Sequence, residues 1–391
     1  MKLYSLNRKS IGAALKYSVV LPFALLLKNK YDNTWLISER SAQARDNGYV
    51  FFEYMQKEHP EQSLYYLIDK NSQDYQKLKK YDNVIQFNSW KHYFYYCLSR
   101  VHISAHVNGC CPEGAIGISR RTKYKLRFQD IFIPHGVSYG ISEFCLKKYA
   151  DINLFICSGK QEYDNVLRNY GYSENEVVYT GFPRLDKWHD IRVNKKQIVL
   201  MPTWRLYLAQ DKEILFEKTK YFEVYQNLLR DIKLKKFLEE KSIKLVFYLH
   251  NEMRKYADCF KTECANIEIV YKDEQYDIQE LLMSSALLIT DYSSVHFDFA
   301  YMKKPVIYFQ FDKKEFFDKQ YKPGDFQAEK NGFGPVVYEK EQLLNTIMEM
   351  YKEDFSMSVE YNNRMRMFYQ IYDNHNCERV YREIYCRYSN I

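Results

Sequence analysis

Residues 287–309 read LLITDYSSVHFDFAYMKKPVIYF, and this stretch indicates the fold class. A β-branched run from Leu287 to Thr290 ends in a short polar turn, a helical pattern follows, and Pro305 opens a second apolar run that ends at Phe309. A strand, a helix and a strand in this order form the βαβ unit of a parallel sheet. The stretch therefore predicts an α/β fold with polar residues at the end of a strand.

The same alternation continues on both sides of this stretch. Short β-branched or aromatic runs are separated by longer helical patterns, which is typical of doubly wound parallel sheets. We expect two such sets, and therefore two Rossmann-like domains that face one cleft. The predicted strands are 34–38, 64–68, 83–87, 101–105, 130–134, 153–158 and 177–180 in the first domain, and 198–202, 244–250, 267–271, 287–290, 306–309 and 335–338 in the second.

The expected domain organisation has four parts. Residues 1–31 form a basic segment that associates with a membrane, 32–190 the first domain and 191–355 the second, with the boundary in a polar stretch. Residues 356–391 contain helical patterns without a further strand, and we expect these helices to pack back across both domains.

The basic segment carries most of the excess charge. The formal net charge is +7, and six positive residues, Lys2, Arg8, Lys9, Lys16, Lys28 and Lys30, precede the first acidic residue, Asp32. The stretch from Ile11 to Leu27 is apolar, but it is short for a span and contains Lys16 and Pro22. We interpret it as a helix lying on an anionic, cytoplasmic membrane surface. The alternatives are an ordinary helix packed on the first domain and an uncleaved signal anchor.

The sequence argues against several classes of protein. Positive charge outside residues 1–31 is balanced by acids, which argues against a nucleic-acid-binding surface. The nine cysteines show no C-x-x-C pair and no metal-ligand spacing with histidine. The chain also lacks a P-loop, a G-x-G-x-x-G after the first strand, a G-x-S-x-G and a D-x-D.

The polar turn after Thr290 is the sharpest candidate site. Ligands of open parallel sheets bind beyond the carboxyl ends of the strands. Asp291, Ser293 and Ser294 lie there, beside the start of a helix, where hydroxyls and backbone N–H groups suit a phosphate or pyrophosphate. Asp298 lies one turn later and suits a ribose hydroxyl. The alternative is a simple N-cap role for Asp291 or Ser293.

Two histidines also follow predicted strands, one in each domain. His135 ends an apolar strand and precedes Gly136, whose missing side chain permits close approach of a substrate; His250 ends another strand. A histidine near its ordinary pKa takes a proton from an alcohol or binds a phosphate oxygen. Three other histidines, His102, His106 and His296, are less well placed, and a structural role is the alternative for each histidine.

Two further segments place cationic groups near the expected cleft. GFPRLDKW, residues 181–188, and MPTWR, residues 201–205, contribute Arg184, Asp186, Thr203 and Arg205, and the arginines suit a diphosphate. Turn formation and ordinary ion pairs explain these segments equally well. A basic run that includes Arg120 and Arg121 precedes His135 and suits an anionic acceptor or lipid headgroups, or is a solvated surface.

Taken in order, these motifs resemble those of the CDP-glycerol glycerophosphotransferases of teichoic acid and capsule synthesis. The resemblance rests on IPHG, GFPRLD, MPTWR, the strand ending in His250, and TDYSSVHFD followed by KPVIYF; SERSAQARDNGYVFF, residues 38–52, is similar to the opening of capsule-associated members. It covers roughly residues 34–350. The family resemblance implies a two-domain GT-B fold, no metal or other cofactor, and a peripheral location on the cytoplasmic membrane face.

The resemblance also implies roles for individual residues. His135 matches the base that deprotonates an acceptor hydroxyl, His250 the second essential histidine, and Ser293 and Ser294 the serines at the donor diphosphate. The implied reaction transfers glycerol phosphate from CDP-glycerol to a lipid-linked or polysaccharide acceptor and releases CMP. The chain departs from many members after His135, where Thr-Pro-Leu-Lys is replaced by residues 137–140, VSYG, and in Asn251, which stands where proline is frequent.

Three other functions remain open from the sequence. A GT-B glycosyltransferase that uses a nucleotide sugar shares the expected diphosphate site, and so does a CDP-ribitol transferase. A membrane-surface scaffold that binds a nucleotide without turnover is the alternative outside the enzymes. A panel of nucleotide donors distinguishes all three from a CDP-glycerol transferase.

Overall fold

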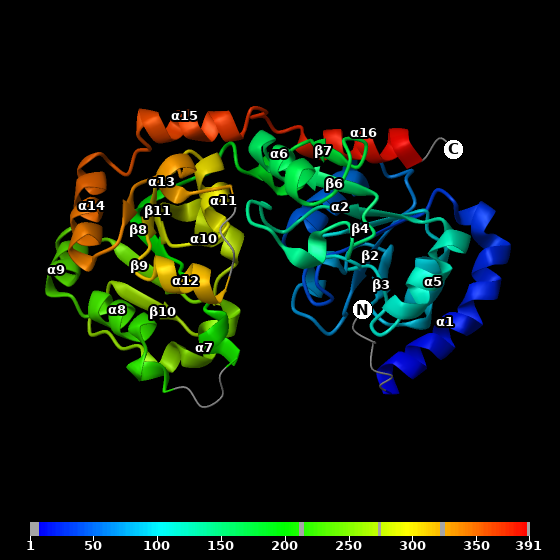
Figure 1. The fold of residues 1–391 in the computed structure, drawn as a ribbon, viewed down its shortest axis with the longest axis horizontal. Helices are drawn as coiled ribbons and strands as arrows, with labels where there is room; N and C mark the ends of the chain where they lie inside the picture. The colour runs from blue at the N-terminus through cyan, green and yellow to red at the C-terminus, as the bar shows by residue number, and fades with distance from the viewer. Residues whose placement is uncertain (1–7, 211–214, 273–274, 321–324, 389–391) are drawn as a thin grey trace. The chain divides into compact units, whose positions relative to one another are not determined.

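The computed structural model describes residues 8–210, 215–272, 275–320 and 325–388, so Lys2 lies outside the described residues. The chain divides into two compact units. Unit 1 comprises residues 1–138, 142–186 and 373–391, and unit 2 comprises residues 139–141 and 187–372. Figure 1 labels many of the helices and strands of both units.

Unit 1 is built on a seven-stranded sheet with the order β3-β2-β1-β4-β5-β6-β7, in which all neighbours pair in parallel. Strands of such a sheet are covered on both faces, and β1, β4 and β6 are accordingly buried along their whole length. The strands are β1 (Trp35–Ser38), β2 (Leu64–Ile68), β3 (Val84–Gln86), β4 (Val101–Ser104), β5 (Gln129–Phe132), β6 (Leu154–Cys157) and β7 (Val177–Tyr179).

The helices of unit 1 include the first and the last helix of the chain. They are α1 (Arg8–Leu27), α2 (Asn47–Glu58), α3 (Tyr75–Leu78), α4 (Trp90–Leu98), α5 (Ile116–Leu126), α6 (Lys160–Asn169) and α16 (Asn376–Tyr388), with short 3-10 helices η1 (Lys28–Tyr31), η2 (Glu143–Cys145) and η3 (Pro183–Lys187).

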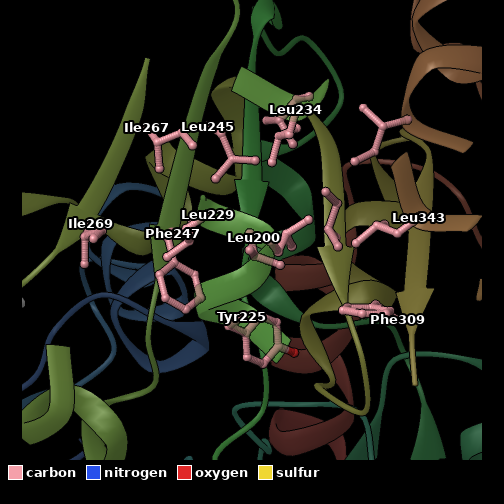
Figure 2. Packing of buried hydrophobic residues seen from close by; sticks show 14 of the residues in the cluster. Leu200, Tyr225, Leu229, Leu234, Leu245, Phe247, Ile267, Ile269, Phe309 and Leu343 are labelled. Atoms are coloured by element: carbon pink, nitrogen blue, oxygen red, sulfur yellow. The ribbon is translucent and has the colours of Figure 1, made fainter. Parts of the chain in front are cut away.

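Unit 2 is built on a six-stranded parallel sheet with the order β10-β9-β8-β11-β12-β13. Its strands are β8 (Asn194–Leu200), β9 (Lys244–Tyr248), β10 (Ile267–Val270), β11 (Ser285–Thr290), β12 (Val306–Phe309) and β13 (Val336–Val337). Figure 2 shows how Leu200, Leu245 and Phe247 from the strands pack with Leu229 and Leu234 from helices. This buried cluster fixes the sheet, and with it the loops at the strand ends.

Unit 2 contains the remaining helices. These are α7 (Leu206–Gln210), α8 (Lys220–Leu229), α9 (Ile232–Glu240), α10 (Ile278–Ser284), α11 (Val295–Tyr301), α12 (Lys313–Lys319), α13 (Ala328–Asn331), α14 (Lys340–Lys352) and α15 (Val359–Phe368), with 3-10 helices η4 (Phe216–Lys218) and η5 (Asn251–Cys259).

Side-chain caps explain where several helices begin. The first N–H groups of a helix lack partners within the helix, and Ser, Thr and Asp side chains supply an acceptor. The caps seen here are Ser89 for α4, Thr219 for α8, Asp231 for α9, Asp277 for α10 and Ser358 for α15.

The predicted fold class is confirmed, because each of the two units holds one parallel α/β sheet, and all the predicted strands form. The chain passes from unit 1 to unit 2 after Asp186, four residues before the expected boundary. Helix α1 is built into unit 1. The chain returns to unit 1 at Asp373, so that α15 belongs to unit 2 and α16 to unit 1.

Helix α1 has two different apolar faces. Ala13, Tyr17, Val20 and Ala24 recur at helical spacing and lie buried in the core of unit 1, where α1 packs on α4 and α5. The opposite face carries large apolar side chains that are exposed, namely Ile11, Leu15, Val19, Phe23 and Leu26. Within the described residues, the helical stretch Ser10–Tyr31 is long and apolar enough to cross a membrane, judged by length and composition only.

Candidate functional site

Each sheet has a switch point, where the strand order reverses. It lies between β1 and β4 in unit 1 and between β8 and β11 in unit 2. Open parallel sheets bind ligands at the carboxyl ends of the strands beside such a point. In unit 2 the segments 201–205 and 291–294 follow the two strands at the switch point, so the topology brings these two predicted segments together.

His135 lies in a loop after β5 whose backbone is held by side chains from other elements. The Asn47 side-chain amide donates to the carbonyl of Pro134 at 2.7 Å. Arg184 Nη1 donates to the carbonyl of His135 at 2.9 Å and to Asp46 Oδ1 at 2.8 Å. The position of the His135 ring is therefore set without any of these side chains bonding to the ring.

Helix α6 holds the other end of this loop. The Glu162 carboxylate accepts the backbone N–H of Ser138 at 2.6 Å and also bonds the backbone and hydroxyl of Ser158, while Asn165 donates to the Ser138 carbonyl at 2.7 Å. Glu162 is 1% exposed, and burial raises its pKa to about 7, against the lowering effect of these hydrogen bonds. One buried carboxylate thus joins the loops that follow β5 and β6.

The His135 side chain is exposed, and a second histidine lies beside it. The ring centroid of His106, in the loop after β4, is 5.2 Å from that of His135. The protein around His135 desolvates the charged form and lowers its pKa; Asp46 opposes this shift, and the charges of Arg184 and Arg40 add to it. The neutral imidazole is therefore favoured, which is the form that accepts a proton.

The segment 181–188 has a structural role in unit 1. Asp186 accepts the backbone N–H groups of Asn376 and Cys377 at 2.8 and 2.9 Å and so caps α16. Gly181 has φ +82°, and a Cβ there would meet the Asn376 side chain at 1.8 Å. Arg184 is 2% exposed and is bonded to His135 and Asp46, so a ligand reaches neither its charge nor that of Asp186 without displacing these contacts.

Arg120 and Arg121 lie on α5 and are both exposed. Arg120 donates to the carbonyl of Tyr149 at 3.0 Å. Helix α5 lies beside α1, since Tyr17 and Thr122 share a hydrogen bond of 2.7 Å. The basic run therefore lies largely on a helix that packs beside α1.

In unit 2, Arg205 is fully buried between two carboxylates. Its Nε and Nη2 donate to Asp312 at 2.7 and 3.0 Å, Nη2 also donates to Asp291 at 2.8 Å, and Nη1 donates to the carbonyl of Thr203 at 2.7 Å. Burial opposes the charged form, but the carboxylates outweigh it and raise the pKa of Arg205 well above its ordinary value. Direct contact between Arg205 and a phosphate would require one of these ion pairs to open.

Asp291 serves the same network. Its side chain accepts the backbone N–H groups of Thr203 at 2.8 Å and Tyr292 at 2.6 Å in addition to the bond from Arg205, and it is 1% exposed. It therefore ties the loop after β8 to the loop after β11. The Thr203 hydroxyl is buried and has no hydrogen-bond partner within the described part of the chain.

Ser293 and Ser294 follow this network and are half-buried. Ser294, and not Asp291 or Ser293, is the N-cap residue of α11, and its side chain makes no capping bond. Asp298 lies on α11 and is 8% exposed, which leaves little of its surface open to a ribose.

His250 follows β9 and stacks on Trp204, with ring centroids 5.7 Å apart and planes 14° apart. Its Nδ1 accepts the backbone N–H of Glu252 at 3.2 Å. In the neutral ring the proton therefore lies on Nε2, which is a hydrogen-bond donor. The His250 side chain is exposed.

Comparison with known proteins agrees with these motifs. The sequence model of the family described as CDP-Glycerol:Poly(glycerophosphate) glycerophosphotransferase matches residues 19–386. The chain belongs to this glycerophosphotransferase family.

Two curated relatives illustrate the range of the family. The chain is 30% identical over 361 residues to the minor teichoic acid biosynthesis protein GgaB of Bacillus subtilis, which covers 90% of this chain and 39% of GgaB. It is 23% identical to the teichoic acid poly(glycerol phosphate) polymerase of the same organism, over 87% of this chain and 46% of that protein. The chain thus spans less than half the length of these relatives.

Solved structures show the same fold. A histidine-to-alanine variant of the wall teichoic acid polymerase TagF superposes with a TM-score of 0.68 at 17% identity, covering 98% of this chain and 99% of that chain. A putative UDP-N-acetylglucosamine 2-epimerase from Listeria monocytogenes gives a TM-score of 0.59 at 12% identity, over 92% and 98% of the two chains. The glycerophosphotransferase fold of this chain is therefore that of TagF.

Within the residues that the structure describes, no group of three or more His, Cys, Asp and Glu side chains has the geometry to hold a metal ion. Metal independence of the chain stays a prediction.

Sequence reasoning did not select several residues that surround His135. Asn47, Glu162 and Asn165 lie within helices, where no motif distinguishes them from ordinary surface or capping residues. His106 was ranked as less well placed than His135, although it follows the predicted strand 101–105 closely. The rule that ligands bind at the strand ends beside a switch point selects His106 only when the strand order of the first sheet is known.

Proposed function

We propose that this chain transfers glycerol phosphate from CDP-glycerol to a hydroxyl group of a lipid-linked or polysaccharide acceptor and releases CMP. The observation that carries the proposal is His135, an exposed imidazole kept neutral by its surroundings and held by a clamped loop after β5. Membership of the glycerophosphotransferase family supports the choice of donor.

In the proposed reaction the acceptor oxygen attacks the β-phosphorus of CDP-glycerol. A new P–O bond forms, the bond from this phosphorus to the bridging oxygen breaks, and its electron pair leaves with CMP. His135 takes the proton of the acceptor hydroxyl and later returns it to solvent. Catalysis by a positioned base contributes typically 10²–10⁴-fold in such reactions.

Unit 2 supplies the groups for the donor phosphates in this proposal. The His250 ring and the hydroxyls of Ser293, Ser294 and Thr203 are proposed as hydrogen-bond partners of a diphosphate. Asp298 is proposed to reach the ribose. Arg205 and Asp291 act through the loops that they hold together, and not by direct contact.

The test incubates the purified chain with a teichoic acid acceptor and, separately, CDP-glycerol, CDP-ribitol and UDP-sugars, with and without EDTA. We expect CMP release with CDP-glycerol, an acceptor mass increased by one glycerol phosphate or more, no effect of EDTA, and loss of turnover in His135→Ala.

The other outcomes identify the competing functions. Release of UDP with transfer of a sugar would make the chain a glycosyltransferase. Preferred turnover of CDP-ribitol would change the proposed donor, and this outcome is tested because a relative in Bacillus spizizenii is a teichoic acid poly(ribitol-phosphate) polymerase. Binding of CDP-glycerol without CMP release would support a scaffold, and full activity of His135→Ala would exclude His135 as the base.

We also propose that unit 1 rests on the anionic, cytoplasmic face of the membrane through α1. Side chains such as Leu15, Phe23 and Leu26 are 65%, 60% and 82% exposed on one face of this helix. The exposed Arg120 and Arg121 of α5 lie on the helix beside it and suit anionic headgroups. Since the opposite face of α1 is part of the core, we propose a helix that lies on the membrane and does not cross it.

Sedimentation with vesicles tests this membrane proposal. We expect binding to phosphatidylglycerol-containing vesicles, weaker binding to phosphatidylcholine vesicles, and a loss of binding in the double variant Phe23→Ser, Leu26→Ser. The matched control is Ile232→Ser, which removes a side chain of 82% exposure from α9 of unit 2. Binding that survives the double variant, or resists alkaline extraction as a spanning helix does, would contradict the proposal.

A further inference from the structure

The switch point of the first sheet lies between β1 and β4, whereas His135 follows β5. The segments that end β1 and β4 therefore lie where an open sheet binds its ligand. They contribute Arg40, two residues after the end of β1, and His106, two residues after the end of β4. The proposed reaction gives neither of these residues a role.

The backbone of His106 is fixed. Its N–H donates to Ser104 Oγ at 3.1 Å, and its carbonyl accepts from the same hydroxyl at 2.8 Å and from the N–H of Gly109 at 2.9 Å. A Cβ at Gly109 would meet Ser104 Oγ at 1.9 Å, so this turn requires glycine. The ring is thereby held with its centroid 5.2 Å from that of His135 and its plane tilted by 30°.

The ring of His106 remains neutral and available. Burial lowers its pKa to about 4, and the nearby charges of His135 and Arg40 act in the same direction, while Asp46 opposes them. Among the hydrogen bonds of the described residues, none uses a ring nitrogen of His106 or of His135. A neutral imidazole offers one donor and one acceptor, so the rings of His106 and His135 can each form a hydrogen bond with the same hydroxyl group.

Arg40 brings a positive charge to the same place. Its side chain is exposed, and no ion pair to it occurs in the described parts of the chain. The preceding residue, Glu39, is buried and accepts the backbone N–H groups of Arg45, Asp46 and Tyr49, which fixes the turn from which Arg40 projects. An unpaired guanidinium on a fixed turn suits a phosphate.

We propose that His106 and Arg40 complete the acceptor side of the site: His106 hydrogen-bonds the attacking hydroxyl beside His135, and Arg40 binds a phosphate group of the same acceptor. The inference rests on the proposed transfer reaction and names its acceptor as a phosphate-bearing chain. The proton of the hydroxyl passes to His135, and His106 stays neutral because a second positive charge on the adjacent ring is repelled.

The test compares His106→Ala, His106→Gln and Arg40→Gln with the unaltered chain and with the control His375→Asn, which removes an exposed histidine of unit 1. Steady-state kinetics at varied acceptor and donor give both KM values and kcat. We expect the KM for the acceptor to rise about tenfold or more in His106→Ala and Arg40→Gln, in keeping with the loss of one hydrogen bond or charge contact, and the KM for the donor to stay within about twofold. His106→Gln, which keeps a donor and an acceptor, should recover part of the loss.

Each other result overturns the inference. If the unaltered chain turns over CDP-glycerol and the variants keep its acceptor KM, the proposed function stands and this inference fails. If both histidine variants lower the melting temperature and both KM values rise equally, His106 is structural. If the unaltered chain turns over no donor, glycerol 3-phosphate is titrated while the imidazole NMR signals are followed, and unchanged signals of His106 and His135 refute the site independently of catalysis.

Discussion

At the carboxyl edge of the second sheet, Arg205 is fully buried between Asp291 and Asp312, whereas at the edge of the first sheet His135 and Arg40 are exposed. In unit 2 the charges of Arg205, Asp291 and Asp312 are paired with one another inside the protein, and the half-buried hydroxyls of Ser293 and Ser294 remain for a ligand. In unit 1 the neutral histidine rings and one cation remain, and the bonds that hold the loop go to its backbone.

The two units differ in whether the residues that support a loop are also the residues that a ligand would contact. The loops of unit 2 are held by charged side chains that the sequence also offers as ligand groups, so a substitution there removes support and charge together. The loop of His135 is held by Asn47, Arg184 and Glu162, so the histidine itself carries little of the support. The substitutions that lower the stability of each unit most should therefore not be the ones that lower activity most.

The largest effect on stability is expected from Arg205→Met. Removing one member of a buried ion pair leaves the other charges without a partner, and Asp291 and Asp312 are both buried here. We expect the free energy of unfolding of unit 2 to fall by about 3–5 kcal/mol, measured by hydrogen exchange of the amides of β11, which reports on this unit alone. The control, Arg366→Met, changes an exposed arginine of α15. A loss below about 1 kcal/mol would refute a supporting role for this network.

A smaller effect is expected from pH, through His296 of α11. The ring is 1% exposed, shares a hydrogen bond of 2.9 Å between Nδ1 and the Tyr308 hydroxyl, and has its pKa lowered to about 3 by burial. An unfolded histidine titrates near pH 6.5, so between about pH 6.5 and 3 the unfolded chain binds one more proton and the free energy of unfolding falls as the pH falls. The contribution of this group lost between pH 7.5 and 5 is about 2 kcal/mol.

Hydrogen exchange of α11 at the two pH values measures this loss. His296→Gln keeps a side-chain acceptor for Tyr308 but does not titrate, so its pH dependence should be flatter by the same amount. Equal pH dependence in the two proteins would show that the pKa of His296 is not lowered in the folded chain.

The sequence predicted the sheets but not the long-range hydrogen bonds and ion pairs that hold the loops at the strand ends, for a physical reason. Runs such as 287–290 and 306–309 are apolar along their length because parallel strands are buried on both faces, and this pattern is local. Arg184 and Arg205 were selected as phosphate ligands because arginine at a strand end suits an anion. Their partners Asp46, Asp312 and the His135 carbonyl lie far away in sequence, and only the folded chain shows that the guanidinium groups are already paired.

The histidines show the same limit. His135 and His250 were selected because each directly follows a predicted strand, and both are exposed in the structure. His106 is set by the order of the strands, and a sequence does not state on which side of β1 the fourth strand is added. Spatial order, and not residue type, decides which strand end forms the centre of a site.

The smallest effect on stability is expected from His135→Asn, and it tests the comparison most directly. The ring is exposed and accepts no hydrogen bond that holds the loop, so unit 1 should lose no more than about 0.5 kcal/mol, as for an ordinary surface substitution. Turnover of CDP-glycerol should nevertheless fall by about 10²–10⁴-fold if the ring is the base. In contrast, Glu162→Gln replaces an acceptor by a donor facing the Ser138 or Ser158 N–H groups, and we expect it to cost about 1–3 kcal/mol. Hydrogen exchange of β5 measures both, and a greater loss of stability in His135→Asn than in Glu162→Gln would mean that the histidine, and not its clamp, supports the loop.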